Sequence, residues 1–365
     1  MYDLAIIGGG PAGAAAAITA GRAGARVLLI ERGRFPRHKV CGEFVSAESL
    51  ALLRGLLDSA ESPLFQDVPS IARARIFVDD RVIATEVAPA AASIARYDLD
   101  SALWEAAIGA QVEARESLAV QRIEGDGPFR ITSTGGNFEA RVVINSTGRW
   151  SNLGAALAPP GKAGAKWLGL KAHFTEVNPP ASVDLYFFEG GYCGVQPVRL
   201  RQSESAEGRV NACAMVRSEI GGTLAEVFAQ HPELARRSRA WRQLSEPVST
   251  SPLIFREPEP TRGNMLLAGD AAGFVDPFVG DGISLALRSG ALAAACLGAF
   301  FRGEASLDLC ANRYRELYTR QLGPVFRNSA KIRHALALPR VLRVPMVSLL
   351  QRFPAAASFM VRKTR

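Results

Sequence analysis

The feature that most constrains the fold lies in the first 31 residues, "MYDLAIIGGGPAGAAAAITAGRAGARVLLIE". An apolar, β-prone stretch at residues 3–7 runs into a glycine-rich turn, and an alanine-rich helix follows. A second apolar stretch at residues 26–30 ends in an acid, Glu31. This order of strand, turn, helix and strand predicts a Rossmann-type α/β unit built on a parallel sheet.

The turn has Gly-x-Gly-x-x-Gly spacing, and each glycine has a physical task. Gly8 permits the tight turn, Gly10 lets the backbone approach a pyrophosphate, and Gly13 lets the helix pack closely on the strand. The start of the helix offers unpaired N–H groups and a partial positive charge to phosphates. Glu31 can accept hydrogen bonds from ribose hydroxyls. The unit therefore predicts a dinucleotide site.

A second stretch, "GNMLLAGDAAGFVDPFVGDGISLALRSGALAA" at residues 263–294, indicates which dinucleotide is bound. It predicts a short strand over 265–268, a loop, and a helix from about Gly282. Asp270 at the end of the strand can hold a ribityl hydroxyl. The loop before the helix can present N–H groups to the flavin edge where charge develops on reduction. A nicotinamide dinucleotide has no ribityl chain, so this stretch favours FAD.

The motif "GDAAGFVDPFVGDGI" resembles the second FAD fingerprint of the aromatic-hydroxylase (p-hydroxybenzoate hydroxylase-like) superfamily of flavoproteins. Within it, the chain is similar to the geranylgeranyl reductase-like branch. "ARYDLDSALWEAA" (95–107) resembles the helix start whose arginine reaches FAD, and "VVINSTGRWSNL" (142–153) resembles the strand-turn that packs on the dinucleotide. "HKVCGE" (38–43) resembles the Cys-Gly element near the flavin ring of the reductases.

The resemblance implies an α/β fold with an α+β insertion. A Rossmann-type FAD-binding domain (1–69, 96–165 and 263–302) would interleave with an antiparallel β-sheet substrate domain (70–95 and 166–262), followed by C-terminal helices (303–365). The predicted FAD contacts come from the two fingerprints and the three matching stretches. They are Gly8, Gly10, Pro11, Ala12, Gly13, Glu31, Arg32, Arg37, Cys41, Gly42, Arg96, Thr147, Gly148, Gly269, Asp270, Pro277, Gly280, Asp281, Gly282 and Ile283.

The middle of the chain predicts the substrate side. Residues 166–174, 183–188, 191–198 and 208–216 alternate in the manner of antiparallel strands. Tyr192 and Pro197 match the ends of the reductases' Tyr-x-Trp-x-Phe-Pro motif, but Gly194 and Gln196 replace the two rings, which predicts a wider cavity or one that admits a substrate of different shape. The Trp-x-Trp-x-Ile-Pro motif of flavin halogenases is absent, which argues against halogenation. The pocket candidates are Tyr186, Phe188, Tyr192 and Gln196, with ordinary sheet packing as the alternative.

The residues before the first substrate strand have two interpretations each. Cys41 could act as a weak acid, or Cys41 could be a small packing residue. Tyr192, later in the chain, is the second candidate for the weak acid. Arg37 and Lys39 could balance phosphate or reduced-flavin charge, or be solvated. Glu43 could lie at the cofactor or cap a helix that begins near Ser46. His173 is interpreted as a core histidine rather than a base.

Composition and charge exclude several function classes. The five cysteines form no C-x-x-C pair, and no histidine, cysteine or carboxylate cluster has metal-ligand spacing, so no metal or disulfide is predicted. Net charge is +8, but the segment from Leu317 to Arg365 carries ten basic and no acidic residues, which leaves −2 for the rest and argues against a nucleic-acid binder.

The basic tail mixes arginine with Leu, Val, Phe and Met. This composition predicts either peripheral contact with an anionic membrane or a helical cover over the substrate cavity. No cleavable leader is evident, and the longest apolar run (291–301) is too short to span a bilayer, so a cytoplasmic location is expected.

The sequence therefore predicts an FAD-dependent oxidoreductase that reduces a C=C bond of a small hydrophobic, prenyl- or polyketide-like substrate. NAD(P)H or another reductant would be a transient electron donor, since no second dinucleotide unit is present. The alternative is FAD-dependent hydroxylation of an aromatic or polyketide ring with O2. A third possibility is a flavin-bearing binding or electron-transfer module.

Overall fold

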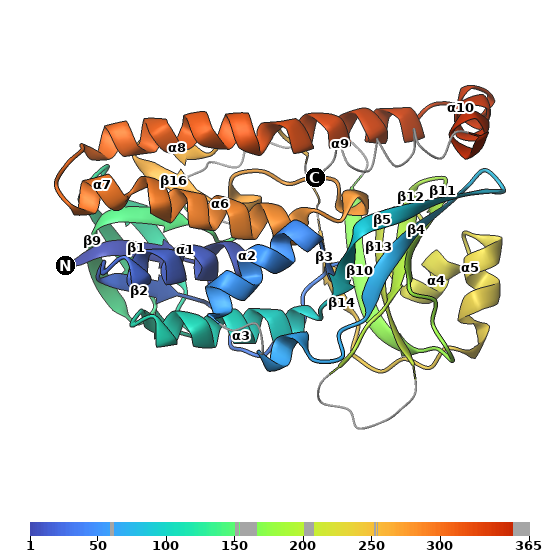
Figure 1. Cartoon of the computed structure of the whole chain (residues 1–365), viewed down its shortest axis with the longest axis horizontal. Helices are drawn as coiled ribbons and strands as arrows, with labels where there is room; N and C mark the ends of the chain where they lie inside the picture. Colours follow the sequence, from blue (N-terminus) through green and yellow to red (C-terminus); the bar gives the residue numbers. More distant parts are fainter. Residues whose placement is uncertain are drawn as a thin grey trace.

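The computed structural model describes residues 1–58, 62–149, 153, 166–200, 208–251, 253 and 255–352. These residues form two eight-stranded sheets that lie side by side, each with its own helices (Figure 1). The parts of the motif at 142–153 and of the basic tail that fall at 150–152 and 353–365 lie outside the described residues.

The first sheet is the predicted Rossmann-type unit. Its strand order is β15-β16-β9-β1-β2-β6, and β7 and β8 extend it beside β9. The strands are β1 (Tyr2–Ile7), β2 (Val27–Ile30), β6 (Glu113–Arg115), β7 (Val120–Glu124), β8 (Phe129–Ser133), β9 (Gly136–Asn145), β15 (Thr261–Arg262) and β16 (Met265–Leu267). The pairs from β16 to β6 are all parallel, which confirms the predicted fold class.

Helices pack against this sheet and against one another. They are α1 (Pro11–Arg22), α2 (Ala47–Leu57), α3 (Arg96–Gly109), α6 (Gly282–Cys296), α7 (Gly298–Phe301) and α8 (Leu307–Gln321), with short 3-10 turns η1 (Pro63–Phe65) and η3 (Gly269–Ala271). Small residues let α1 and α6 come very close: a methyl group on Gly290 would lie 2.0 Å from the carbonyl oxygen of Ala12.

Among the described residues, one helical stretch, Gly282–Phe301, is long and apolar enough to cross a membrane by length and composition. It is longer than the apolar run at 291–301 because it includes the first turns of α6. Half of it is buried against neighbouring elements, and its tight contact with α1 gives it the packing of a core helix.

The second sheet is the one that was predicted to form the substrate domain, and its strand order is β14-β10-β13-β12-β11-β4-β5-β3. Its strands are β3 (Phe44–Val45), β4 (Ser70–Val78), β5 (Arg81–Ser93), β10 (Trp167–Thr175), β11 (Ser182–Phe188), β12 (Gly191–Pro197), β13 (Arg209–Arg217) and β14 (Val248–Thr250). The four predicted strands lie within one residue of β10 to β13, and their mutual pairs are antiparallel. The β11–β4 pair is parallel. Helices α4 (Leu224–Phe228) and α5 (Pro232–Arg237), followed by η2 (Ser238–Ala240), cover one face.

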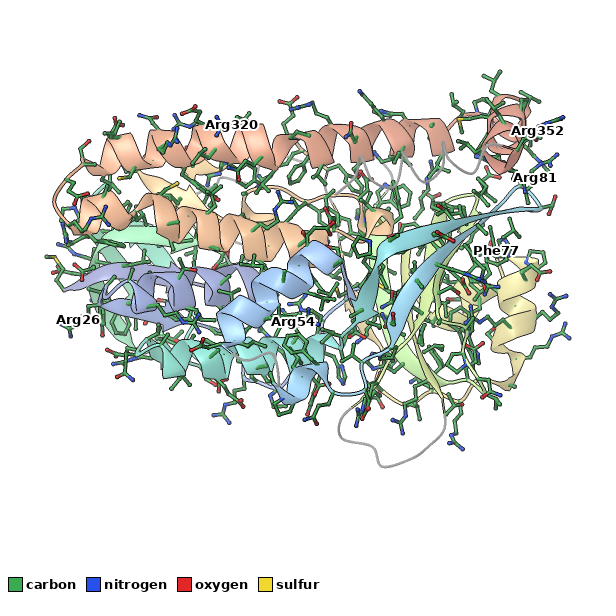
Figure 2. The ribbon with its side chains drawn as sticks, viewed as in Figure 1. Arg26, Arg54, Phe77, Arg81, Arg320 and Arg352 are labelled. Carbon is green, nitrogen blue, oxygen red and sulfur yellow. The ribbon has the colours of Figure 1, made fainter. Side chains whose placement is uncertain are left out.

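The C-terminal helices join the two halves of the molecule. Figure 1 shows α8 and α9 (Gly323–Leu336) running one after the other along one edge, from the first sheet to the second. Helix α10 (Arg340–Arg352) then packs beside the hairpin of β4 and β5. Arg343 binds Asp79 at 2.6 Å and Arg81 donates to Gln351 at 3.3 Å, in the region where Figure 2 labels Arg81 and Arg352.

Candidate functional site

The glycines of the first turn have two kinds of surroundings: Gly8 and Gly13 are closely packed, whereas the space around Gly10 is open. A methyl group on Gly8 would lie 2.5 Å from the Ser146 carbonyl oxygen, and one on Gly13 would lie 1.8 Å from that of Gly8. Both positions therefore need glycine for close packing. A methyl group on Gly10 would meet only a guanidinium nitrogen of Arg96, at 3.9 Å. Gly10 thus presents its backbone to open space, as the approach of a pyrophosphate requires.

Three further glycines are open in the same way. A methyl group on Gly42, Gly148 or Gly282 would have no heavy atom within 4 Å. Gly10, Gly42, Gly148 and Gly282 follow the carboxyl ends of β1, β2, β9 and β16, which are neighbours in the parallel sheet. Carboxyl ends of parallel strands share one edge, where ligands of such sheets bind. The backbone at Gly10, Gly42, Gly148 and Gly282 is therefore uncovered along this edge. We call this strip the trough, and it can accommodate an extended dinucleotide.

A group of cations lies beside this trough. Arg96 forms a bidentate ion pair with Asp100 through contacts of 2.7 Å, and Arg37 pairs with Glu31 at 2.6 Å. Burial, and then repulsion by Arg37 and Arg96, lowers the pKa of Lys39 to about 8. The group contains three basic side chains but only two carboxylates, Glu31 and Asp100. The remaining positive charge can bind a pyrophosphate.

Glu31 has more protein partners than its predicted ribose role requires. Its buried carboxylate accepts from the backbone N–H of Gly9 at 2.8 Å and of Gly33 at 2.9 Å, and from both terminal nitrogens of Arg37. A ribose hydroxyl would have to share or replace an Arg37 contact. The neighbouring Arg32 is exposed.

The second fingerprint meets the first across the sheet edge. Gly269 has φ +61°, and a methyl group there would lie 2.9 Å from Cβ of Ala12. Asp270 keeps a third of its side chain exposed and lies 3.5 Å from Arg149, so a carboxylate oxygen is available to a hydroxyl ligand. The 3-10 turn η4 (Pro277–Val279) leads to Gly280 at φ +78° and to α6.

The residues around the start of α6 and after β9 complete this edge. Asp281 and Ile283 are buried beside the open Gly282. Thr147 donates both its hydroxyl, at 2.7 Å, and its backbone N–H, at 3.1 Å, to the Asn145 side-chain oxygen, so the open residue that this turn offers a ligand is the next one, Gly148. The residues present therefore fit FAD along the whole edge of the sheet.

An apolar cavity of about 180 Å³ adjoins this edge. One wall is formed by Gly42 and by the loop Pro277–Gly280, both predicted FAD contacts. Strands β4, β5, β11, β12 and β13 form the floor, and α9 and α10 form the cover. The few polar lining residues are Thr85, Tyr192, Gln196 and Cys213. The cavity is thus an apolar chamber that meets the cofactor edge at one side.

Comparison with known proteins agrees with this geometry. The family described as FAD binding domain matches residues 1–317. The chain belongs to this family. It is an FAD-dependent oxidoreductase, and FAD is its cofactor.

Among curated relatives, the flavoprotein is 25% identical over 359 residues to the digeranylgeranylglycerophospholipid reductase of Methanocella arvoryzae, covering 92% of this chain and 87% of the relative. It is also 25% identical over 321 residues to the 1H-pyrrole-2-carbonyl-[peptidyl-carrier protein] brominase of Pseudoalteromonas luteoviolacea, covering 80% and 76%. A geranylgeranyl bacteriochlorophyll reductase-like structure from Thermoplasma acidophilum shares the fold, with a TM-score of 0.76, 22% identity, and coverage of 100% and 95%.

Two of the four predicted pocket residues of the flavoprotein lie at the cavity. Tyr192 and Gln196 line it, and Gln196 donates to the Ser93 hydroxyl at 2.6 Å. Tyr186 and Phe188 do not line the cavity. They lie on the opposite face of β11, where Tyr186 stacks on Phe77 and accepts from Arg237 at 3.0 Å.

This arrangement has a simple cause. Side chains alternate across a strand, so the cavity receives Val183, Leu185 and Phe187 from β11. Both faces of this strand are apolar or aromatic, and the sequence does not show which one meets the flavin edge.

Cys41 lies next to the cavity and not in its lining. Its sulfur accepts from the Glu43 N–H at 3.3 Å, and its carbonyl oxygen accepts from Asn211 at 3.0 Å. Burial raises the pKa of the Cys41 thiol, although Arg96 acts in the opposite direction. Cys41 is therefore a neutral thiol at neutral pH, and its neighbour Gly42 is the residue that the cavity contacts.

A buried ionic cluster behind Cys41 was missed by sequence reasoning. The Glu43 carboxylate is fully buried and accepts from Lys171 at 2.7 Å, from His173 at 2.8 Å and from the Arg96 backbone N–H at 3.0 Å. Burial opposes ionisation, but the charges of Lys171 and then His173 lower the pKa of Glu43 to about 2. The cluster therefore holds an ionised carboxylate that links α3, through the Arg96 backbone, to β10 of the second sheet.

The cluster also corrects the alternative role of Glu43. Helix α2 is capped by Ser46, whose hydroxyl accepts from the Ser49 N–H, and not by Glu43. Glu43 has φ +61°, which is costly for a residue with a side chain. A signal was present in the sequence: Lys171 and His173 are two residues apart on one face of an otherwise apolar strand.

Proposed function

We propose that this oxidoreductase reduces a C=C bond in a hydrophobic, prenyl- or polyketide-like substrate. The observation that carries the proposal is the apolar cavity, since one of its walls is made by the predicted FAD contacts Gly42 and Pro277–Gly280. FAD, when bound and reduced, supplies the hydride. The name of the Methanocella relative, a reductase of prenyl lipids, supports the same reaction class.

The size of the cavity limits the reacting group. An apolar protein cavity of about 150 Å³ accepts benzene, and this cavity measures about 180 Å³. It therefore suits one ring or a short isoprenoid segment near the cofactor edge. Gly194 and Gln196 stand where the reductase motif carries rings, and both line the cavity. Larger residues there would reduce its volume.

Tyr192 is the proposed proton donor. It lines the cavity, and its hydroxyl makes no hydrogen bond to any residue that the structure describes. Burial raises the pKa of Tyr192 well above its usual value, so the phenol keeps its proton until a substrate arrives. One alkene carbon would take the hydride and the other this proton, and water would then reprotonate the phenolate. Cys41 is the second candidate, one residue from the cavity wall.

The test is turnover under anaerobic conditions. The FAD-loaded protein is reduced chemically and mixed with apolar alkenes of graded length, and the products are measured by mass spectrometry. A product that gains a hydrogen pair without O2 supports the proposal. A product that gains one oxygen atom, only when O2 is admitted, would support hydroxylation instead. Flavin reoxidation with no organic product under either condition would support an electron-transfer module.

Two variants then assign the proton donor. Tyr192→Phe is expected to slow alkene reduction by about 10²–10⁴-fold while flavin reduction by dithionite is unchanged. Cys41→Ala serves as the comparison, because Cys41 lies beside the cavity but does not line it. If Cys41→Ala loses turnover and Tyr192→Phe retains it, the roles are reversed.

A further inference from the structure

The C-terminal helices carry a stripe of exposed cations, and the nearest acid along the helix, Glu316, pairs with Arg313 at 3.3 Å. Arg320, Arg327 and Lys331 are exposed, and their spacing of seven and four residues places them on one side of α8 and α9. None of the three forms an ion pair with a residue that the structure describes. Figure 2 shows Arg320 and Arg352 along the same outer edge of the molecule. The described part of this segment, 317–352, contains no Asp or Glu.

The stripe ends in an exposed apolar patch on α10 and the turn before it. Leu338, Val341, Leu342 and Leu349 expose between 38% and 78% of their surface. Four of the ten large apolar side chains that are exposed in the described residues lie within these 12 positions, so they form a cluster.

The patch and the cavity lie on opposite sides of the same helix. Helical spacing places Val341, Leu342 and Leu349 on the outer side of α10. Val347 and Leu350, on the inner side, line the cavity. A surface that joins exposed aliphatic side chains to unpaired cations is typical of proteins that lie on an anionic bilayer.

We propose that α8–α10 form a docking surface for an anionic lipid bilayer, with the apolar patch in the interface and the cation stripe on the headgroups. An acidic protein would pair with the cations but would not favour four solvated aliphatic residues at the end of the stripe. Docking on a bilayer buries these residues and brings the cover of the apolar cavity to the lipid.

The test is co-sedimentation of the FAD-loaded full chain with vesicles of phosphatidylcholine, with and without phosphatidylglycerol. Binding is expected with phosphatidylglycerol at low salt, and high salt should weaken it. Arg327→Gln/Lys331→Gln should weaken binding about fivefold for each charge removed. Val341→Ser/Leu342→Ser/Leu349→Ser should weaken it at least about tenfold.

Matched controls come from exposed positions outside the C-terminal helices. Arg122→Gln/Arg130→Gln removes the same charge from exposed positions on β7 and β8, and Val177→Ser removes the most exposed large apolar residue. These variants should bind vesicles as the parent does.

Three results would overturn the proposal: no binding to phosphatidylglycerol vesicles at low salt, equal losses in the controls, or binding to poly-L-glutamate without binding to vesicles. The last would indicate an acidic protein partner. The docking proposal can fail without the proposed reaction failing. If alkene reduction is correct, the docking variants should still reduce a short, water-soluble alkene at the rate of the parent protein.

Discussion

The buried Glu43 should make a large, pH-dependent contribution to stability. Its pKa falls from 4.5, the ordinary value expected in the unfolded chain, to about 2 in the folded protein. At about 1.4 kcal/mol for each pKa unit, the ionised carboxylate stabilises the fold by about 3 kcal/mol. Because the folded pKa is depressed, this contribution is complete above about pH 4.5 and is lost as the pH falls toward 2.

Glu43→Gln is the perturbation that tests this value. The amide leaves the ammonium of Lys171 and the ring of His173 without a counter-charge, so the variant should lose about 3 kcal/mol at pH 7. For a chain of 365 residues the entropy of unfolding is about 0.8 kcal/mol/K, so the melting temperature should fall by about 4 °C.

The assay is urea unfolding of the FAD-saturated protein at several pH values from 7 to 3, followed by circular dichroism. The gap between parent and variant should shrink below about pH 4.5. Glu48→Gln, an exposed acid on the first turn of α2, is the matched control and should stay within about 0.5 kcal/mol of the parent. Adding Lys171→Met to Glu43→Gln should recover part of the loss, because the unpaired ammonium is removed.

Two results would refute the reasoning. If Glu43→Gln is as stable as the parent at pH 7, the ion cluster does not stabilise the fold. If the loss is the same at every pH, packing and not charge is its source.

Three further predictions concern the cofactor edge and the cavity. The Gly10→Ala variant should fold with little change in melting temperature but should bind FAD at least about tenfold more weakly, as measured by fluorescence titration. The Gly13→Ala variant should not yield folded protein, because its methyl group would meet a backbone oxygen. The pKa of Lys39 is about 8 without ligand and should rise when ADP supplies a pyrophosphate. The pH dependence of reductive methylation of Lys39 measures this pKa. An unchanged pKa would place the phosphates elsewhere. Tyr186→Phe should cost about 1 kcal/mol of stability but leave turnover intact, unlike Tyr192→Phe, since only Tyr192 lines the cavity.

The cofactor half of the site was predictable because its signals are local. The turn at Gly8–Gly13 and the loop before Gly282 each combine a strand, glycines and a helix start within a short segment, and the parallel sheet brings their ends to one edge. The resemblance to known flavoproteins added Arg96, which lies beside Gly10.

The substrate half was less predictable because its arrangement depends on contacts between distant segments. Glu43 meets Lys171 and His173 across 128 and 130 residues, and no spacing in the sequence encodes that contact. Tyr186 and Phe187 could not be told apart as cavity residues, because a strand with two apolar faces does not show which one turns to the cofactor.

The interleaving of the two sheets has a consequence for how the molecule can be divided. Strand β16, which pairs with β9, and the loop that follows it are synthesised only after the whole second sheet. A single cut in the gene therefore cannot release a fragment that holds the flavin by itself, and an N-terminal piece ending before residue 263 should emerge from expression colourless. Only two pieces produced together, and able to reassemble, could restore the yellow complex.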